Sequence, residues 1–190
     1  MLYGTNRRHS RDRVPLQIIR GNQPTEPVKL SSLAPPIDGE AIRSGMVIVK
    51  DTGTVNGVAN VAGAFRKAVD ADAIVEALSV FIATHDQDAH DVQAAGGIVG
   101  LDCSDDYEVQ TGYFDKSGGA YVLNEPLTVK VGGLVTHATE GDYIIGYVTK
   151  IGTGSDASLP YVGKTLPTAT ATDAEVLQFK TARNGQIKAA

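Results

Sequence analysis

The sequence has no tryptophan, a single cysteine and few aromatic residues, and each shortage excludes something. Aromatic residues make up 6% of the 190 positions, so a folded core must be built mainly from Val, Ile, Leu and Ala. Cys103 cannot form an intramolecular disulfide, and there is no cysteine pair for a zinc site. No apolar run approaches the roughly 18 residues of a membrane-spanning helix, and no apolar stretch follows the basic N-terminal residues as in a signal peptide. The sequence therefore predicts a soluble protein that is not secreted.

The residues that are present fit a globular chain rich in turns. Hydrophobic residues make up 42% of the sequence and charged residues 21%, which is ordinary for a folded domain. Glycine is abundant, at 21 of 190 residues. A chain of this length suits one domain, or one domain with an arm.

Charge and proline divide the chain into two parts. Residues 1–50 carry eight Lys or Arg and four Asp or Glu, a net charge of +4, whereas residues 51–190 carry nine and eighteen, a net charge of −9. Five of the eight prolines lie within the first 36 residues. Because proline lacks a backbone donor and favours extended geometry in the residue before it, we expect residues 1–44 to form an extended arm. Only short β segments, such as 16–19, are expected within it.

The tip of this arm is basic and is followed by apolar side chains that need a partner. Its arginines could contact nucleic acid or an acidic protein surface, and a solvated terminus is the alternative. The net acidity of the chain, and a body without interleaved aromatic and basic residues, favour a protein partner over nucleic acid. The predicted interaction residues are Arg7, Arg8, Arg11, Arg13, Leu16, Ile18 and Ile19.

The body, residues 45–183, is predicted to be mainly β. Short apolar segments alternate with Gly or Asp turns at intervals typical of a β-sandwich or a small β-barrel. Gly132-Gly133 is a two-residue hairpin signal. One short helix is expected within 64–78, a long loop at 152–173 and a loose tail at 184–190. Residues 55–61 are predicted as a weak strand or a hairpin. The other predicted strands are 46–50, 78–84, 97–101, 107–111, 120–122, 127–131, 134–137, 143–151 and 176–181.

Four local patterns resemble functional sites, and each fails a chemical requirement. Residues 162–165 (VGKT) echo a phosphate-binding loop, but Ser158 stands where its first glycine should be. Residues 85–91 (HDQDAHD) gather possible metal ligands without the glycine and distal acid of a calcium loop, so we expect a solvated acidic loop. In 103–106 (CSDD), neighbouring acids would raise a thiol pKa, which favours Cys103 as a core residue. Residues 152–154 (GTG) lack the third glycine of a dinucleotide site and read as a loop.

No pattern in the sequence predicts catalysis. An enzyme would be expected to bring a nucleophile and a base, or convergent acids, into one pocket. The four histidines lie at 9, 85, 90 and 137 with no motif around them. The sequence therefore predicts a protein that is not an enzyme and holds no cofactor or metal.

The body of the chain resembles the head decoration, or capsid cement, proteins of tailed bacteriophages over roughly 45–181. The similarity is a succession of turns and strands, and no individual functional residue transfers. The segments that carry it are GGIVGLDCS at 96–104, YEVQT at 107–111, YFD at 113–115, Tyr121, PLT at 126–128, GLV at 133–135, GDYIIGYVT at 141–149 and VLQFKT at 176–181.

The resemblance implies a non-enzymatic virion protein that binds the outside of an expanded head and ties neighbouring capsid subunits together. Its partners would be the major capsid protein and further copies of itself, with a trimer favoured over a dimer, and neither nucleic acid nor a membrane. Assembly would take place in the host cytoplasm. A tail or baseplate component is the alternative structural role, and a small hydrolase or ligand-binding module is the alternative from another class.

Overall fold

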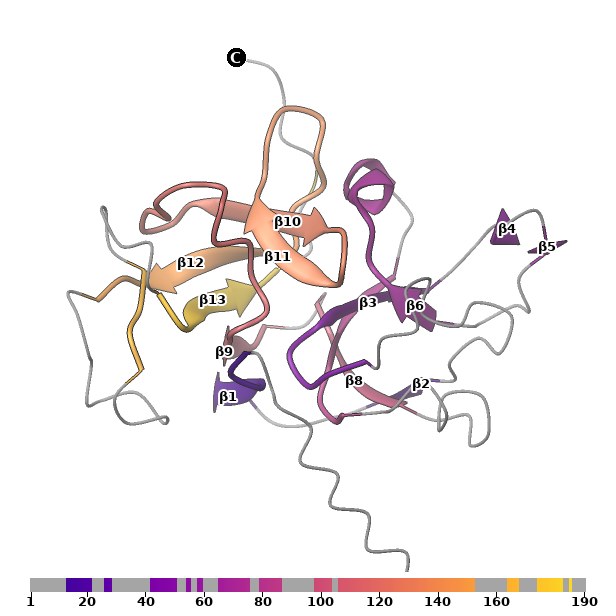
Figure 1. Ribbon diagram of the computed structural model, residues 1–190, viewed down its shortest axis with the longest axis horizontal. Helices are drawn as coiled ribbons and strands as arrows, with labels where there is room; N and C mark the ends of the chain where they lie inside the picture. Colours follow the sequence, from indigo (N-terminus) through magenta and orange to yellow (C-terminus); the bar gives the residue numbers. More distant parts are fainter. Residues whose placement is uncertain are drawn as a thin grey trace, which may run out of the picture.

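The structure, a computed structural model, describes residues 13–21, 26–28, 42–50, 54–55, 58–59, 65–75, 79–86, 98–103, 106–152, 164–167, 174–182 and 185. The described residues are mainly β, as predicted, and most of their strands belong to two antiparallel sheets (Figure 1). The architecture is sandwich-like and not a closed barrel. No helix among these residues is long and apolar enough to cross a membrane.

The larger sheet has six strands in the order β1-β9-β13-β12-β10-β11. Its outer strand β11 is covered by the segment that continues from β9, because Val135 forms a bridge with Phe114 and its carbonyl accepts a bond from the Asp115 N–H at 2.7 Å. The strands are β1 (Gln17–Arg20), β9 (Glu108–Thr111), β10 (Pro126–Lys130), β11 (Leu134–His137), β12 (Gly146–Lys150) and β13 (Leu177–Thr181).

The smaller sheet has five strands in the order β2-β8-β7-β3-β6, and a separate two-stranded hairpin pairs β4 with β5. The bounds are β2 (Glu26–Val28), β3 (Val47–Lys50), β4 (Thr54–Val55), β5 (Val58–Ala59), β6 (Phe65–Lys67), β7 (Val80–Ala83) and β8 (Ile98–Asp102). A short 3₁₀ helix, η1 (Asp70–Ile74), follows β6.

The two sheets share one apolar core and are joined by backbone hydrogen bonds at the β10–β11 turn. Buried side chains of both sheets belong to the same cluster, including Val47 and Ile82 from one and Leu127 and Phe179 from the other. The Val47 N–H donates to the Gly133 carbonyl at 2.7 Å, and the Gly133 N–H donates to Ala68 at 3.2 Å. Gly133 has a φ of +70°, and a Cβ on it would lie 2.8 Å from the Val47 carbonyl oxygen. The predicted two-residue Gly-Gly turn spans three residues, 131–133, because Lys130 pairs with Leu134. This turn is also the point where the sheets meet.

Most predicted strands are confirmed within one or two residues, but two of them need correction. The short helix expected within 64–78 is present among the described residues as the 3₁₀ helix η1, because residues 65–67 pair with β3 as a strand instead. The Asp72 carboxylate binds Arg66 through two bonds of 2.6 and 2.7 Å and accepts the Val69 N–H, which caps the start of η1 and ties it to β6. The strand expected at 120–122 is a turn region instead. The strand expected at 143–151 begins at Gly146, since the Tyr143 N–H donates to Ala73 rather than to a strand.

Part of the predicted arm lies on the body of its own chain. The segment predicted at 16–19 forms β1, which pairs antiparallel with β9, and β2 pairs with β8. The N-terminal region thus supplies an edge strand to each sheet. Residues 1–12 lie outside the described residues.

Candidate protein-interaction site

The described surface exposes four large hydrophobic side chains more than half, and they fall into two pairs. Val122 and Leu123 are neighbours in the chain and are each 55% exposed. Ile74 and Val131 are 63% and 51% exposed and come from η1 and the β10–β11 turn. Exposed aliphatic side chains favour binding when they are held together and in place. The surroundings of each pair therefore decide what it can do.

The first pair belongs to a tightly bonded turn, residues 121–125, that we call the apolar turn. The Glu125 N–H donates to the Val122 carbonyl at 3.1 Å, and the Val122 N–H donates to Glu125 Oε2 at 2.8 Å. Asn124 has a φ of +64°, a conformation that asparagine adopts more readily than most residues. Its N–H donates to the Val148 carbonyl at 2.9 Å, which fastens the turn to β12. The two apolar side chains are thus presented on a fixed backbone.

Tyr121 anchors the apolar turn on the buried side. Its side chain is buried, its hydroxyl donates to the Asp115 carbonyl at 2.8 Å, and its ring meets Phe114 edge-on with centroids 5.7 Å apart. On the other side it stacks on His137 at 3.9 Å, and His137 Nδ1 lies 2.5 Å from Glu125 Oε1. Burial, together with the nearby Asp115 carboxylate, raises the pKa of Tyr121 above its usual value. The phenol therefore stays protonated and remains a donor.

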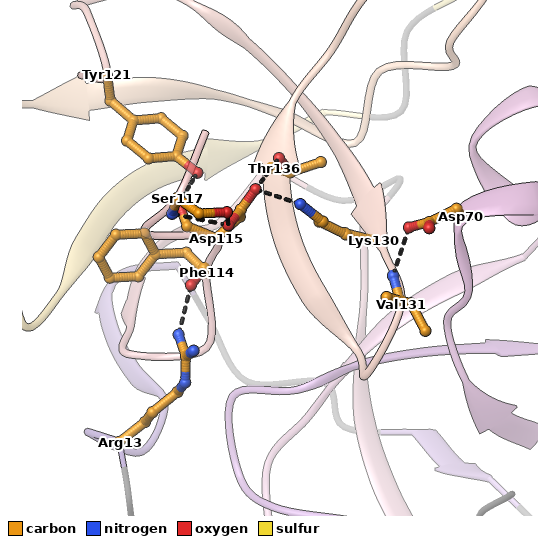
Figure 2. Close-up of polar contacts among 9 residues, drawn as sticks. All are labelled: Arg13, Asp70, Phe114, Asp115, Ser117, Tyr121, Lys130, Val131 and Thr136. Atoms are coloured by element: carbon orange, nitrogen blue, oxygen red, sulfur yellow. Dashed lines mark hydrogen bonds and ion pairs between the residues drawn. The ribbon is translucent and has the colours of Figure 1, made fainter. Parts of the chain in front are cut away.

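Asp115 fixes the loop that leads into Tyr121. Its Oδ1 accepts bonds from the Ser117 N–H at 2.9 Å and the Ser117 hydroxyl at 2.7 Å, and its Oδ2 pairs with Lys130 Nζ at 2.5 Å. Figure 2 shows these groups converging on the carboxylate, with Thr136 beside it at 3.4 Å. Burial alone would raise the pKa of Asp115, but the bonds from Lys130 and Ser117 outweigh burial and lower the pKa to about 2. Such a weakly basic carboxylate is a poor general base for Ser117, so the arrangement suits support of a surface better than catalysis.

The second apolar pair lies on a surface that we call the acidic corner, formed by Asp70, Ile74, Val131, Glu140 and Asp142. The Val131 N–H donates to Asp70 Oδ1 at 2.8 Å, as Figure 2 shows, and joins the β10–β11 turn to η1. The Tyr143 N–H donates to the Ala73 carbonyl at 2.7 Å, which brings the end of the β11–β12 loop beside η1 (Figure 1). Within the described part of the chain, no Lys or Arg forms an ion pair with Asp70, Glu140 or Asp142. The corner therefore combines exposed aliphatic side chains with acids that have no ion pair to a described Lys or Arg.

The structure describes four of the seven predicted arm residues. Arg13 donates to the carbonyls of Gly112, at 3.1 Å, and Phe114, so this arginine binds its own chain. Leu16 and Ile18 are partly buried against the chain's own core, and Ile19 is half-buried in β1. Arg7, Arg8 and Arg11 lie outside the described residues, so they stay a prediction.

The other sequence patterns lie only partly within the described residues. Cys103 is fully buried in the core, as predicted. Lys164, from the pattern that echoes a phosphate loop, forms an ion pair with Glu175 at 2.6 Å. Of the 85–91 loop only His85 and Asp86 are described, and Asp86 accepts the Ser44 N–H at 2.9 Å. The described residues include no group of three or more His, Cys, Asp or Glu placed to hold a metal ion.

Sequence reasoning missed both exposed pairs. The prediction of a strand at 120–122 placed Val122 at the end of a β segment and left Leu123 unassigned. The available signal was that this apolar pair precedes Asn124, a residue that favours turns. For Ile74 and Val131 no such signal exists, because only the fold brings η1 and the β10–β11 turn together.

Comparison of the chain with protein-family models, curated proteins and solved structures found no match.

Proposed function

We propose that this chain is a non-enzymatic capsid decoration protein. In this role it binds the outer surface of an expanded bacteriophage head and ties neighbouring subunits of the major capsid protein together. The observation that carries the proposal is the apolar turn, in which Val122 and Leu123 are exposed on a backbone fixed by Glu125 and Val148. The resemblance of segments such as 107–111 and 141–149 to decoration proteins supports the same function.

A rigid apolar turn suits attachment to a repeating surface. Ordering a flexible segment on binding costs free energy, whereas a turn that is already fixed loses little. Tyr121, Glu125 and His137 hold the turn before any partner arrives. Several copies in a homo-oligomer would then multiply modest contacts through avidity. Attachment would therefore rest on a preformed contact repeated over the shell.

The fold limits which residues of the arm can be deleted in a test of the arm hypothesis. Removing residues 1–40 would delete β1 and β2, the edge strands of the two sheets. A deletion of residues 1–12 leaves both strands and the Arg13 contacts in place. Residues 1–12 are therefore the part of the arm to test for reach to a neighbouring subunit, and we expect their deletion to lower head occupancy while the body stays folded. Unchanged occupancy would count against the arm hypothesis.

The proposal is tested by co-sedimentation with empty expanded heads assembled from the major capsid protein encoded in the same genome. The variant changes Val122→Ser and Leu123→Ser, and the matched control changes the exposed Ala120→Ser in the same loop. Because buried apolar anchors supply most binding energy, we expect the double variant to need at least about tenfold more protein for half occupancy. The control should bind like the unchanged chain. An unchanged chain that does not co-sediment with heads, or a double variant that binds them normally, would contradict the proposal.

A further inference from the structure

The acidic corner has the character of a docking surface for a basic, partly apolar segment. Ile74 and Val131 expose aliphatic surface on η1 and the β10–β11 turn, and Asp70, Glu140 and Asp142 lie on the linked segments without an ion pair to Lys or Arg among the described residues. Its parts are held together by the Val131–Asp70 and Tyr143–Ala73 hydrogen bonds. The corner is therefore a built surface assembled from three separate segments of the chain.

The chain itself contains a segment of complementary chemistry. Residues 1–12 include two large apolar side chains, Leu2 and Tyr3, followed by three arginines, Arg7, Arg8 and Arg11, and a single acid, Asp12. By contrast, residues 51–190 carry a net charge of −9. Opposite charges steer association and fix the register of two surfaces. Leu2 and Tyr3 would cover the aliphatic pair while the arginines meet the acids.

The length of this segment is sufficient for exchange between copies. Arg13 is held by the carbonyls of Gly112 and Phe114, so the point to which residues 1–12 are attached is fixed on the body. Twelve extended residues span up to about 40 Å, which exceeds the width of a small sheet. An arm of this length can reach a second copy that lies beside the first.

We propose that the acidic corner binds residues 1–12 of a second copy of this chain. The proposal rests on the homo-oligomer of the proposed function and identifies the contact that would hold it together. It assigns self-association to the corner and shell binding to the apolar turn, so the two surfaces have different partners. Since β10 separates Leu123 from Val131, one variant need not disturb the other surface.

Complementation between two variants tests the proposal by sedimentation velocity, without heads. The acceptor lacks residues 1–12 and keeps its corner. The donor keeps its arm and carries Asp70→Asn, Glu140→Gln and Asp142→Asn. The Asn side chains preserve the acceptor oxygens used by the Val131 and Thr139 N–H groups, so the corner should keep its fold. A second donor with Ile74→Ser and Val131→Ser removes the aliphatic surface instead of the charge.

The expected result is that each variant alone associates at least tenfold more weakly than the unchanged chain, while an equimolar mixture of donor and acceptor forms a heterodimer. Raising the salt concentration should weaken this heterodimer, because surface charges are screened. A mixture that does not associate, a donor that associates like the unchanged chain, or an unchanged chain that is monomeric at every concentration would overturn the proposal. The variant with Val122→Ser and Leu123→Ser should self-associate normally, which separates failure here from failure of head binding.

Discussion

Replacing Asp115 by Asn should remove a defined part of the acid sensitivity of this protein. Asp115 is buried, and Lys130 and Ser117 hold its pKa at about 2 against an ordinary value of 3.8. Between these two pH values the unfolded chain binds more protons at this carboxyl than the folded chain does. The stabilisation from Asp115 is therefore complete above about pH 5 and is lost as the pH falls towards 2.

The size of the effect follows from the two pKa values. A change from 3.8 to about 2 corresponds to about 2 kcal/mol of folding free energy at neutral pH. The same relation leaves about 1 kcal/mol at pH 3 and less than about 0.5 kcal/mol at pH 2. Asn keeps an oxygen for the Ser117 bonds but not the charge that pairs with Lys130 at 2.5 Å. The difference in stability between the two proteins should therefore shrink as the solution is acidified.

Urea denaturation of both proteins at pH 7, 5, 3 and 2 measures this difference directly. Other carboxyl groups titrate in both chains and cancel when one unfolding free energy is subtracted from the other. We expect the unchanged chain to be more stable by about 2 kcal/mol at pH 7 and pH 5, with the two converging by pH 2. If the two free energies run parallel from pH 7 to pH 2, Asp115 does not hold the charge that the structure assigns to it.

Two further substitutions test the junction of the sheets and the anchor of the apolar turn. Gly133→Ala should destabilise the fold by at least about 1 kcal/mol more than Gly132→Ala in thermal unfolding. Both glycines have positive φ, but only at Gly133 would a Cβ meet the Val47 carbonyl oxygen, at 2.8 Å; equal losses would refute this explanation. Tyr121→Phe should cost about 1 kcal/mol of unfolding free energy in urea, because the bond to the Asp115 carbonyl is lost. An unchanged midpoint would show that this bond does not anchor the turn.

The sheets could largely be predicted because local patterns and tertiary packing agree there. The β-branched segment at 78–84 and the Gly132-Gly133 turn reappear as β7 and the β10–β11 hairpin. The helix within 64–78 is shorter than its apolar spacing predicts, because residues 65–67 pair with β3 and the Arg66–Asp72 ion pair ties this strand to η1. An i to i+6 ion pair between a strand and a 3₁₀ helix leaves no periodic signal in the sequence.

The candidate site was much harder to predict than the fold. Tyr121 and His137 stack although they are far apart in the chain, and Asp115 meets Lys130 only because β11 is covered by the segment after β9. Such contacts depend on strand order, which the sequence pattern did not specify. The arm was predicted from proline and charge, but its pairing with β9 and β8 was not, since edge strands carry weak alternation.

A photo-activated cross-linker placed at position 123 tests most directly whether the apolar turn contacts the shell. The same group placed at position 131, beyond the far end of β10, is the comparison. On occupied heads we expect position 123 to cross-link to the major capsid protein and position 131 to cross-link to another copy of this chain. Occupied heads on which position 123 forms no cross-link to the capsid protein would contradict the account.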